Sequence, residues 1–128
     1  MKANELMLGD WVYGLYPDGS RYKPPFRISA VDTYPSNRSP RIVTAGGYGF
    51  QEEDLAPIPL TPEILEKNGF VNNDLPFING WEQYGLFLYP AGEGYRINCG
   101  QNVSMVIDTV HQLQHALKLC GIEKEIVL

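Results

Sequence analysis

Residues 59–70 read PLTPEILEKNGF, and this stretch divides the chain into two parts of different character. Thr61 can accept hydrogen bonds from the first amide groups of a helix, and Pro62 has the φ angle suited to the first helical position. Gly69 can adopt the left-handed conformation that ends a helix and lets Phe70 fold back on it. The stretch therefore predicts a short helix with well-specified ends.

The residues before this helix are typical of β structure. Short segments rich in aromatic and β-branched residues alternate with turn signals, and residues 26–31, FRISAV, alternate with the period of two expected of a half-buried strand. The expected strands are 10–16, 26–31, 41–44 and 48–50. Several short strands joined by close turns favour a small SH3-like barrel over residues 1–58.

The residues after the helix return to β structure and end in a second helix. Residues 85–89 and 95–99 are typical of an antiparallel hairpin, and 102–106 are expected to add a third strand. From Asp108, an expected N-cap, an apolar stripe recurs at spacings of three, four and three residues. Its members are Val110, Leu113, Leu117 and Cys120.

The sequence therefore predicts an α+β fold, in which antiparallel strands over residues 59–128 are covered by the C-terminal helix. We expect residues 1–128 to form a single domain with two halves, 1–58 and 59–128. The apolar stripe should pack on the sheet, with Leu113 and Leu117 nearly fully buried and His111 and His115 at its margins. An exposed dimerisation face is the alternative for this stripe.

The composition of the 128 residues, 44% hydrophobic and 20% charged, is that of a globular domain and excludes disordered and fibrous classes. The first ten residues lack the apolar core of a signal peptide, and no apolar run approaches the length needed to cross a bilayer. Cys99 and Cys120 are therefore expected to be free thiols in a reducing compartment. The prediction is a cytoplasmic protein without a membrane partner.

The net charge of −5 is unevenly distributed along the chain. Residues 19–41 carry five basic residues against Asp32 alone, a balance of +4, whereas residues 42–128 carry four basic and eleven acidic residues, a balance of −7. Such an asymmetry can mark a surface for an anionic partner, and it is equally typical of a solvated loop. The sequence leaves both interpretations open.

We find no recognisable catalytic, metal or cofactor motif in the chain. His111 and His115 share one helix face, but the glutamate that a zinc protease would need after the first histidine is Gln112. The acidic run 52–54 is typical of a solvated surface, and the glycine-rich residues 46–49 are typical of a hairpin turn. We therefore assign no catalytic residue, metal site or cofactor.

Several aromatic residues of the first half lie beside basic residues in the sequence. We expect Trp11, Tyr13 and Phe26 to fill the barrel, and other aromatic side chains to remain available to a ligand. Small barrels often bind peptides or single-stranded nucleic acid with exposed aromatic and basic residues. The candidate ligand-binding residues are Tyr16, Arg21, Tyr22, Lys23, Arg27, Tyr34, Arg38 and Arg41.

Four segments of the chain resemble a set of small uncharacterised proteins encoded in Bacteroides-type gut bacteria and their prophages. The segments are MKANEL at 1–6, GDWV at 9–12, PIPLTPEILEKNGF at 57–70 and VHQLQ at 110–114. At His115 the chain departs from these relatives, which carry an aromatic residue there. The resemblance implies a bacterial, prophage-linked, cytoplasmic origin, and it implies no activity.

These observations favour a non-enzymatic binding or interaction module for a protein or peptide partner. The first alternative is a nucleic-acid-binding protein that uses the basic, aromatic-rich segment 19–41, although the acidity of the rest of the chain opposes it. The second alternative is a small enzyme whose site is assembled from scattered polar residues. Association into a homo-oligomer is left open.

Overall fold

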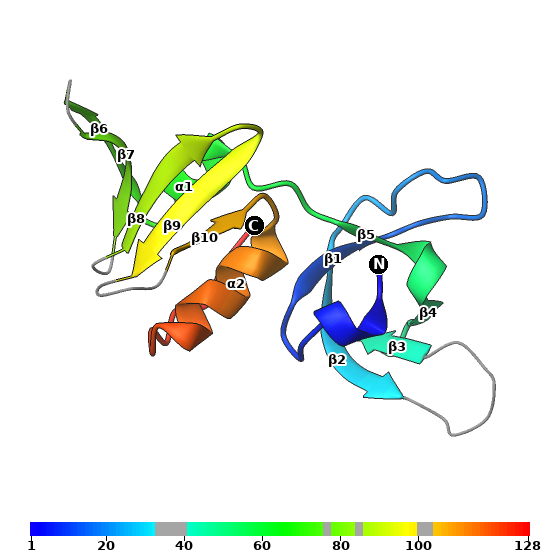
Figure 1. Cartoon of the computed structure of the whole chain (residues 1–128). Coiled ribbons are helices and arrows are strands. Elements are labelled where there is room, and N and C mark those ends of the chain that lie inside the picture. The colour runs from blue at the N-terminus through cyan, green and yellow to red at the C-terminus, as the bar shows by residue number, and fades with distance from the viewer. Residues whose placement is uncertain (33–40, 76–77, 84–85, 100–103) are drawn as a thin grey trace. The chain divides into compact units, whose positions relative to one another are not determined.

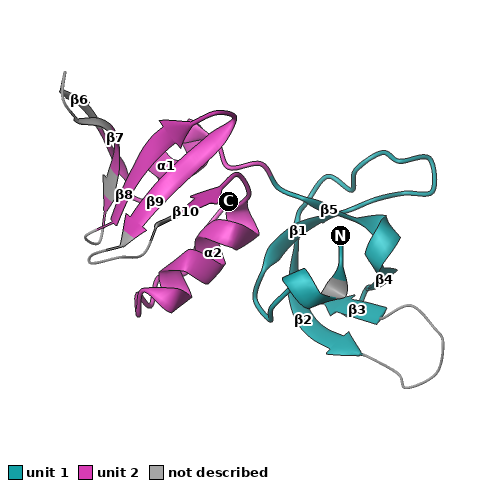
Figure 2. Ribbon diagram, in the orientation of Figure 1, with its two compact units in different colours: residues 1–58 teal, residues 59–128 magenta. Residues whose placement is uncertain are grey.

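The structure is a computed structural model that describes residues 1–32, 41–75, 78–83, 86–99 and 104–128. The chain forms two compact units, Met1–Ile58 and Pro59–Leu128 (Figure 2). Each unit has its own five-stranded antiparallel sheet (Figure 1). The predicted α+β class is confirmed, since the described residues form two antiparallel sheets and two α-helices.

Unit 1 contains five short strands and two 3₁₀ turns. In chain order they are η1 (Ala3–Glu5), β1 (Trp11–Gly14), β2 (Phe26–Asp32), β3 (Arg41–Thr44), β4 (Gly49–Gln51), η2 (Glu52–Asp54) and β5 (Leu55–Pro57). The strand order in the sheet is β4-β3-β2-β1-β5. The described strands do not close into a barrel, so only the coarser part of the predicted architecture is established for this half.

Strand β2 changes its pairing along its length. Its first residues pair with β1, with Phe26 opposite Val12, and its later residues pair with β3. The register shifts between Ile28 and Ala30, which is the signature of a β-bulge. The strand can therefore pair with β1 near its start and with β3 further along.

The core of unit 1 lies on one side of β1. Val12 and Gly14 are buried, whereas Trp11 and Tyr13 are half-buried on the opposite side, because successive side chains of a strand point to opposite faces. The prediction that Trp11 and Tyr13 fill a barrel is therefore wrong. Phe26, as expected, packs against the core residues Leu6, Val12, Ile28, Ile42, Phe50 and Leu55.

Unit 2 is a helix, a five-stranded meander and a second helix. In chain order it contains α1 (Pro62–Lys67), β6 (Val71–Leu75), β7 (Ile78–Gln83), β8 (Leu86–Ala91), β9 (Gly94–Cys99), β10 (Ser104–Ile107) and α2 (Val110–Leu119). The strand order is β10-β9-β8-β7-β6, so each strand pairs with its neighbours in sequence. The β8–β9 hairpin confirms the sequence-based prediction, whereas the β6–β7 hairpin was not predicted.

Helix α1 has the ends that its sequence predicts. The Thr61 side chain accepts a hydrogen bond from the Ile64 amide at 3.3 Å. At the other end Gly69 has a φ of +88°, and the Phe70 amide donates to the Leu65 carbonyl at 3.0 Å. The predicted N-cap and the glycine stop are both confirmed.

Helix α2 begins one residue later than expected. Thr109, and not Asp108, is the N-cap, and its side chain accepts from the Gln112 amide at 3.4 Å. The Gln112 side chain in turn accepts from the Asp108 amide at 2.8 Å, which secures the residue before the cap. The cap therefore uses both side chains to satisfy amide groups at the start of the helix.

Three members of the apolar stripe, Val110, Leu113 and Leu117, are core as predicted, whereas Cys120 is half-buried. Leu113 is 0% exposed and Leu117 1% exposed. His111, however, is also buried, at 4% exposure, so the expectation that both histidines lie at the margins is wrong for this residue. No helix in the part of the chain that the structure describes has both the length and the apolar character required to cross a membrane.

Candidate functional site

Five aromatic rings of unit 1 form a continuous series of ring contacts in space, and we call this group the aromatic row. Its members are Tyr16, Tyr22, Phe26, Phe50 and Tyr48. Tyr16 and Tyr22 are stacked, with ring centroids 3.8 Å apart and an interplanar angle of 17°. Two of the predicted ligand-binding residues are therefore in direct contact.

The remaining rings of the aromatic row join edge to face or at a tilt. The Tyr22 ring lies 5.6 Å from Phe26 and 5.7 Å from Phe50, in both cases edge-on. Phe26 lies 5.3 Å from Phe50 and 5.5 Å from Tyr48. These separations are in the range that aromatic pairs prefer, so the rings support one another in fixed orientations.

The loop between β1 and β2 brings Tyr16 and Tyr22 together. The Tyr16 amide donates to Ser20 and the Tyr22 amide donates to Gly14, at 2.8 and 2.9 Å. Within the turn, the Asp18 carboxylate accepts from the Ser20 hydroxyl at 2.6 Å and from its amide at 2.9 Å. These hydrogen bonds, the one from the hydroxyl first, hold the pKa of Asp18 below its usual value.

Gly14 leaves the space that the rings occupy. A Cβ atom at this position would lie 2.8 Å from Cζ of Phe50 and 3.0 Å from Cε2 of Phe26. Both distances are shorter than or at the limit of normal contacts, so any side chain at position 14 would displace the rings. The aromatic row thus requires that position 14 of β1 has no side chain.

The aromatic row is exposed at its two ends and buried in its middle. Tyr16 is 44% exposed and Tyr48 57% exposed, whereas Phe50 is 8% exposed. Tyr22 and Phe26 are half-buried against the core of the unit. The described part of the row therefore presents two accessible rings that are anchored by buried ones.

Two of the predicted basic residues lie on the other side of β1. The Arg21 guanidinium is 4.5 Å from the centroid of the Tyr13 ring, and that of Arg27 is 5.4 Å from the Trp11 ring. Trp11 and Tyr13 alternate along β1 with the inward-facing Val12 and Gly14. The two arginines are therefore separated from the aromatic row by the strand itself.

The other predicted residues are not gathered at one place. Lys23 is exposed, and Arg41 lies on β3, where its guanidinium occupies the space beside Gly49 of β4. Tyr34 and Arg38 lie outside the described residues. The structure thus brings together Tyr16 and Tyr22, places Arg21 and Arg27 over the rings of Tyr13 and Trp11, and places Arg41 beside Gly49.

Three members of the aromatic row were not among the predicted ligand-binding residues: Phe26, which was expected to fill the barrel, Tyr48 and Phe50. Tyr48 follows the predicted turn at Gly46 and Gly47, which the structure confirms with φ angles of +98° and +86°. Phe50 is two residues further on and faces the core. The alternation of aromatic and small residues after this turn was the sequence signal for Tyr48 and Phe50. The pairing of β4 with β3 is nevertheless needed to bring Phe50 to Tyr22.

The acidic run 52–54 forms the turn η2 at the edge of the same unit. The carbonyl of Asp54 accepts from the Leu15 amide at 2.8 Å, one residue before Tyr16. The amino group of Met1 donates to the carbonyl of Glu52 at 2.9 Å. Glu53 is exposed. Negative charge therefore lies beside the exposed end of the aromatic row.

The histidine and cysteine candidates lie in unit 2. The rings of His111 and His115 meet edge-on with centroids 5.6 Å apart, and Nδ1 of His111 is 3.1 Å from Oγ1 of Thr109. The described residues contain no group of three or more histidine, cysteine or acidic side chains placed to hold a metal. This pair therefore adds no metal site to the described part of the chain.

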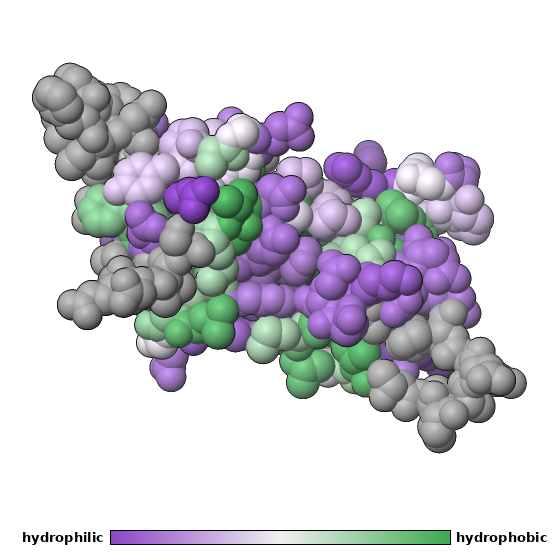
Figure 3. Space-filling view, in the orientation of Figure 1, coloured by the Kyte–Doolittle hydropathy of each residue, from purple (hydrophilic) through white to green (hydrophobic). Residues whose placement is uncertain are grey.

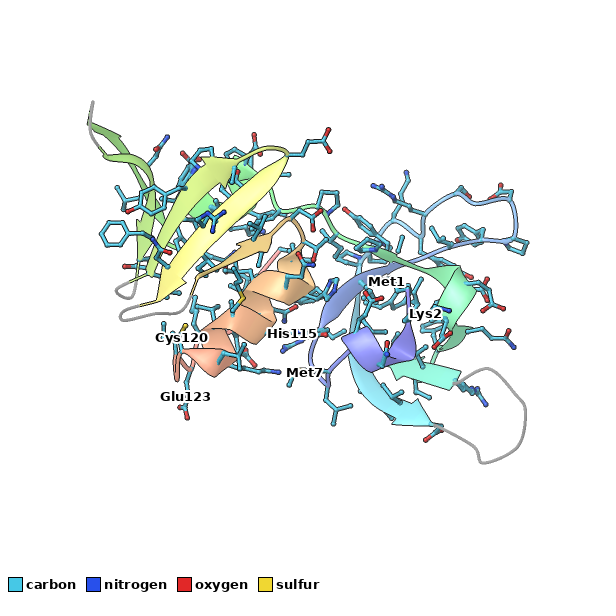
Figure 4. The ribbon with its side chains drawn as sticks, viewed as in Figure 1. Met1, Lys2, Met7, His115, Cys120 and Glu123 are labelled. Atoms are coloured by element: carbon cyan, nitrogen blue, oxygen red, sulfur yellow. The ribbon has the colours of Figure 1, made fainter. Side chains whose placement is uncertain are left out.

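Cys120, at the end of α2 (Figure 4), is disulfide-bonded, so the prediction that it is a free thiol is wrong. The side chain of Cys99, the only other cysteine of the chain, lies outside the described residues. Cysteines far apart in a sequence are joined only when the fold brings them together, which spacing alone does not indicate. A disulfide-bonded sulfur cannot act as a nucleophilic thiolate.

Comparison of the chain with protein-family models, with curated proteins and with solved structures gives no match. The resemblance to Bacteroides-type and prophage proteins therefore stays a prediction.

Proposed function

We propose that this chain is a non-enzymatic binding module in which unit 1 holds an extended, proline-containing peptide against the aromatic row. The observation that carries the proposal is the continuous contact of five rings, with Tyr16 and Tyr48 exposed at the ends. On the face drawn in Figure 3, hydrophobic residues reach the surface of both units between hydrophilic ones.

The physical basis is that aromatic side chains offer a large apolar surface at a small entropic cost. The rings of Tyr16 and Tyr48 are already oriented by their neighbours, so little freedom is lost when a ligand packs on them. Their hydroxyl groups remain available for hydrogen bonds to a peptide backbone. A polyproline II segment suits such a surface because it is extended and ordered before it binds.

The charge beside the aromatic row favours a basic residue in the ligand. The turn η2 contributes Glu52, Glu53 and Asp54, and it is hydrogen-bonded to the residue that precedes Tyr16. A ligand arginine next to the prolines would lie near these carboxylates. Such rim contacts contribute mainly to specificity and to the rate of association.

We also propose that unit 1 is an SH3-like barrel. The strand order β4-β3-β2-β1-β5 and the 3₁₀ turn between β4 and β5 support this proposal. The change of partner along β2 supports it as well, because a strand shared by two parts of a sheet allows the sheet to curl. Domains of this kind dock proline-rich segments in aromatic-lined grooves.

Nucleic-acid binding through residues 19–41 has less support. The guanidinium groups of Arg21 and Arg27 already lie over the rings of Tyr13 and Trp11, and Arg41 is on β3. A nucleic-acid site needs basic groups that follow a phosphate backbone along one surface. We propose a protein or peptide partner, and we assign no residue to an enzymatic role.

The cellular location stays a prediction. A cytoplasmic protein was expected partly because both cysteines were expected to be free, and the disulfide at Cys120 removes that premise. Disulfides persist mainly in oxidising compartments. Prophage linkage and a homo-oligomeric state likewise remain predictions.

The test is titration of the full chain with the peptide acetyl-Pro-Ala-Pro-Pro-Ala-Pro-Arg-amide, followed by calorimetry and by amide chemical shifts. Tyr16→Ala and Tyr48→Ala are each expected to weaken binding about tenfold, as removal of a central aromatic contact commonly does. Val71→Ala, at a side chain 63% exposed in unit 2, is the control and should bind as the parent does.

Two outcomes would contradict the proposal. In the first, the peptide binds equally well to the parent and to both tyrosine variants, which would place the contact elsewhere. In the second, single-stranded DNA binds with a strong salt dependence while the peptide does not, which would favour the nucleic-acid alternative.

A further inference from the structure

The chain turns away from β2 just before β1 begins. Two hydrogen bonds join this part of the chain to β2. The Gly9 amide donates to the Ile28 carbonyl at 2.7 Å, and the Ile28 amide donates to the Asp10 carbonyl at 2.9 Å. Residues 7–10 then form a turn, in which Gly9 has a φ of +89°. Asp10 secures it, since its amide donates to Met7 at 3.1 Å and its carboxylate accepts from Met7 at 2.8 Å.

As a result, among the described residues the second half of β2 has a neighbouring strand on one side only. From Ala30 to Asp32 it pairs with β3, with Ala30 opposite Val43 and Val31 opposite Ile42. In an antiparallel ladder, alternate residues direct their amide and carbonyl groups to opposite sides. Within residues 29–32, the backbone groups of alternate residues therefore face an edge with which no other strand of the described residues pairs.

A groove of about 570 Å³ runs along this edge. One wall is β2 and the other is formed by Leu6 and the first residues of the turn, of which Met7 is labelled in Figure 4. Met7 is 44% exposed and Leu8 60% exposed, so apolar side chains are accessible at its rim. The lining residues are Leu6, Met7, Leu8, Ser29, Ala30 and Val31.

The two ends of the groove differ in charge. Asp32 is exposed at the end of β2, and Glu5 is exposed just before the lining segment. Arg41 is the cross-strand neighbour of Asp32, but its guanidinium lies beside Gly49 of β4, on the other side of β3. Arg27 lies at the opposite end, where its Nε donates to the Gly9 carbonyl at 3.4 Å.

We propose that this groove is a second binding site, distinct from the aromatic row, that takes an extended peptide as an added strand antiparallel to β2. On this side of β2 the hydrogen bonds with β1 and Gly9 end at Ile28, and the added strand extends the ladder beyond that residue. Main-chain hydrogen bonds supply affinity, and alternate apolar side chains of the peptide pack on Met7, Leu8 and Val31.

The antiparallel direction fixes which end of the peptide carries charge. β2 runs toward Asp32, so a strand antiparallel to it has its N-terminal end beside Asp32 and Glu5. A lysine or arginine at that end of the peptide complements these carboxylates. The preferred ligand is thus a basic residue followed by alternating apolar residues.

The first test is titration of the ¹⁵N-labelled full chain with acetyl-Lys-Val-Thr-Val-Thr-Val-amide. We expect saturable shifts of the amides of residues 6–8 and 29–32, together with slower hydrogen exchange in β2. Replacing the lysine by glutamate should weaken binding. N-methylation of a central peptide bond should weaken it about tenfold, because the peptide then lacks a ladder hydrogen bond.

Three variants make the test specific to the groove. Met7→Lys is expected to abolish the shifts, whereas Leu119→Lys, at a side chain 73% exposed in α2, should leave them unchanged. Asp32→Lys should reverse the preference between the lysine and glutamate peptides. Tyr48→Ala should bind as the parent does, which separates this site from the proposed function.

Several results would overturn the proposal. The absence of any shift at millimolar peptide is one, and equal binding of the N-methylated peptide is another, because it would show that no ladder forms. Protection of β2 that depends on protein concentration and not on peptide would identify a second copy of the chain as the occupant.

Discussion

Asn68 and Val127, which are 59 residues apart, are joined by two hydrogen bonds of 2.8 Å each. The Asn68 amide group donates to the Val127 carbonyl, and its oxygen accepts from the Val127 amide. The same group also donates to the Ile64 carbonyl at 2.8 Å. One buried side chain therefore closes the end of α1 and holds the C-terminal segment, in which Ile126 is 1% exposed.

Replacement of Asn68 by Ala is expected to lower the free energy of unfolding by about 1–3 kcal/mol, because backbone groups at Val127 and Ile64 would lose their partner. Denaturation with urea measures this change. Asn4→Ala, at an exposed position in unit 1, is the control and should leave the midpoint unchanged. A parent-like midpoint for Asn68→Ala would show that the segment is not held by this contact.

Replacement of Leu117 by Ala should be among the most destabilising single changes in α2. The side chain is 1% exposed, so its truncation removes buried contacts and leaves a cavity, at a cost of about 2–5 kcal/mol. Leu119→Ala, at a leucine 73% exposed, is the matched control. Equal denaturation midpoints for the two variants would argue that the stripe is an exposed dimerisation face.

Replacement of Gly14 by Ala should disturb the aromatic row. The added Cβ would lie 2.8 Å from Phe50, and such overpacking commonly costs about 1–3 kcal/mol. The near-ultraviolet circular dichroism of the rings should change with it. Combining Gly14→Ala with Phe50→Leu should restore part of the stability, since the smaller side chain makes room; additive losses would contradict the steric explanation.

The stability of unit 2 should fall at alkaline pH through Tyr95. Burial, and then the carboxylate of Glu63, raise the pKa of Tyr95 above its ordinary value of 10.0. The unfolded chain therefore loses this proton first as the pH rises, so stability is fully present below pH 10 and is lost as the pH passes the folded-state pKa. Urea midpoints across this range measure the loss.

Two variants identify the source of this alkaline loss. Tyr95→Phe should flatten the pH dependence, because phenylalanine does not titrate. Glu63→Gln should flatten it in part, because only the smaller of the two causes is removed. An unchanged slope in Tyr95→Phe would assign the loss to other groups.

The disulfide at Cys120 predicts that the unreduced chain, once denatured, reacts with no thiol reagent. After reduction, both cysteines of the chain should react. Reduction should also lower the free energy of unfolding, by about 2–4 kcal/mol for a typical disulfide. Full reactivity before reduction would restore the interpretation of free thiols.

The features that the sequence determined by itself are local ones. Thr61 and Gly69 specify the ends of α1 because a cap and a left-handed stop involve residues only a few positions away. Leu113 and Leu117 specify the buried face of α2 because residues four apart share a helix side. The turn at Gly46 and the β8–β9 hairpin were predictable for the same reason.

The features that only the tertiary structure decided depend on which strands become neighbours. β1 could present either face to the core, and its pairing with β2 and β5 turned Trp11 and Tyr13 away from it. Consequently Arg21 and Arg27, which are adjacent in sequence to Tyr22 and Phe26 of the aromatic row, lie on the opposite face of the strand. A shift of one residue in a strand reverses its faces, so composition cannot predict this outcome.

Long-range contacts explain the remaining differences in the same way. Tyr48 reaches Phe26 because β3 carries the chain back beside β2, and Asn68 reaches Val127 across most of unit 2. The edge of β2 with which no other described strand pairs arises because of the turn that Met7 and Asp10 close before β1. Such contacts form only after distant segments have met. The entropic cost of closing the long loop between these segments must be offset by burial elsewhere. The ends of the helices were therefore predictable from the sequence, whereas both proposed binding surfaces required the fold.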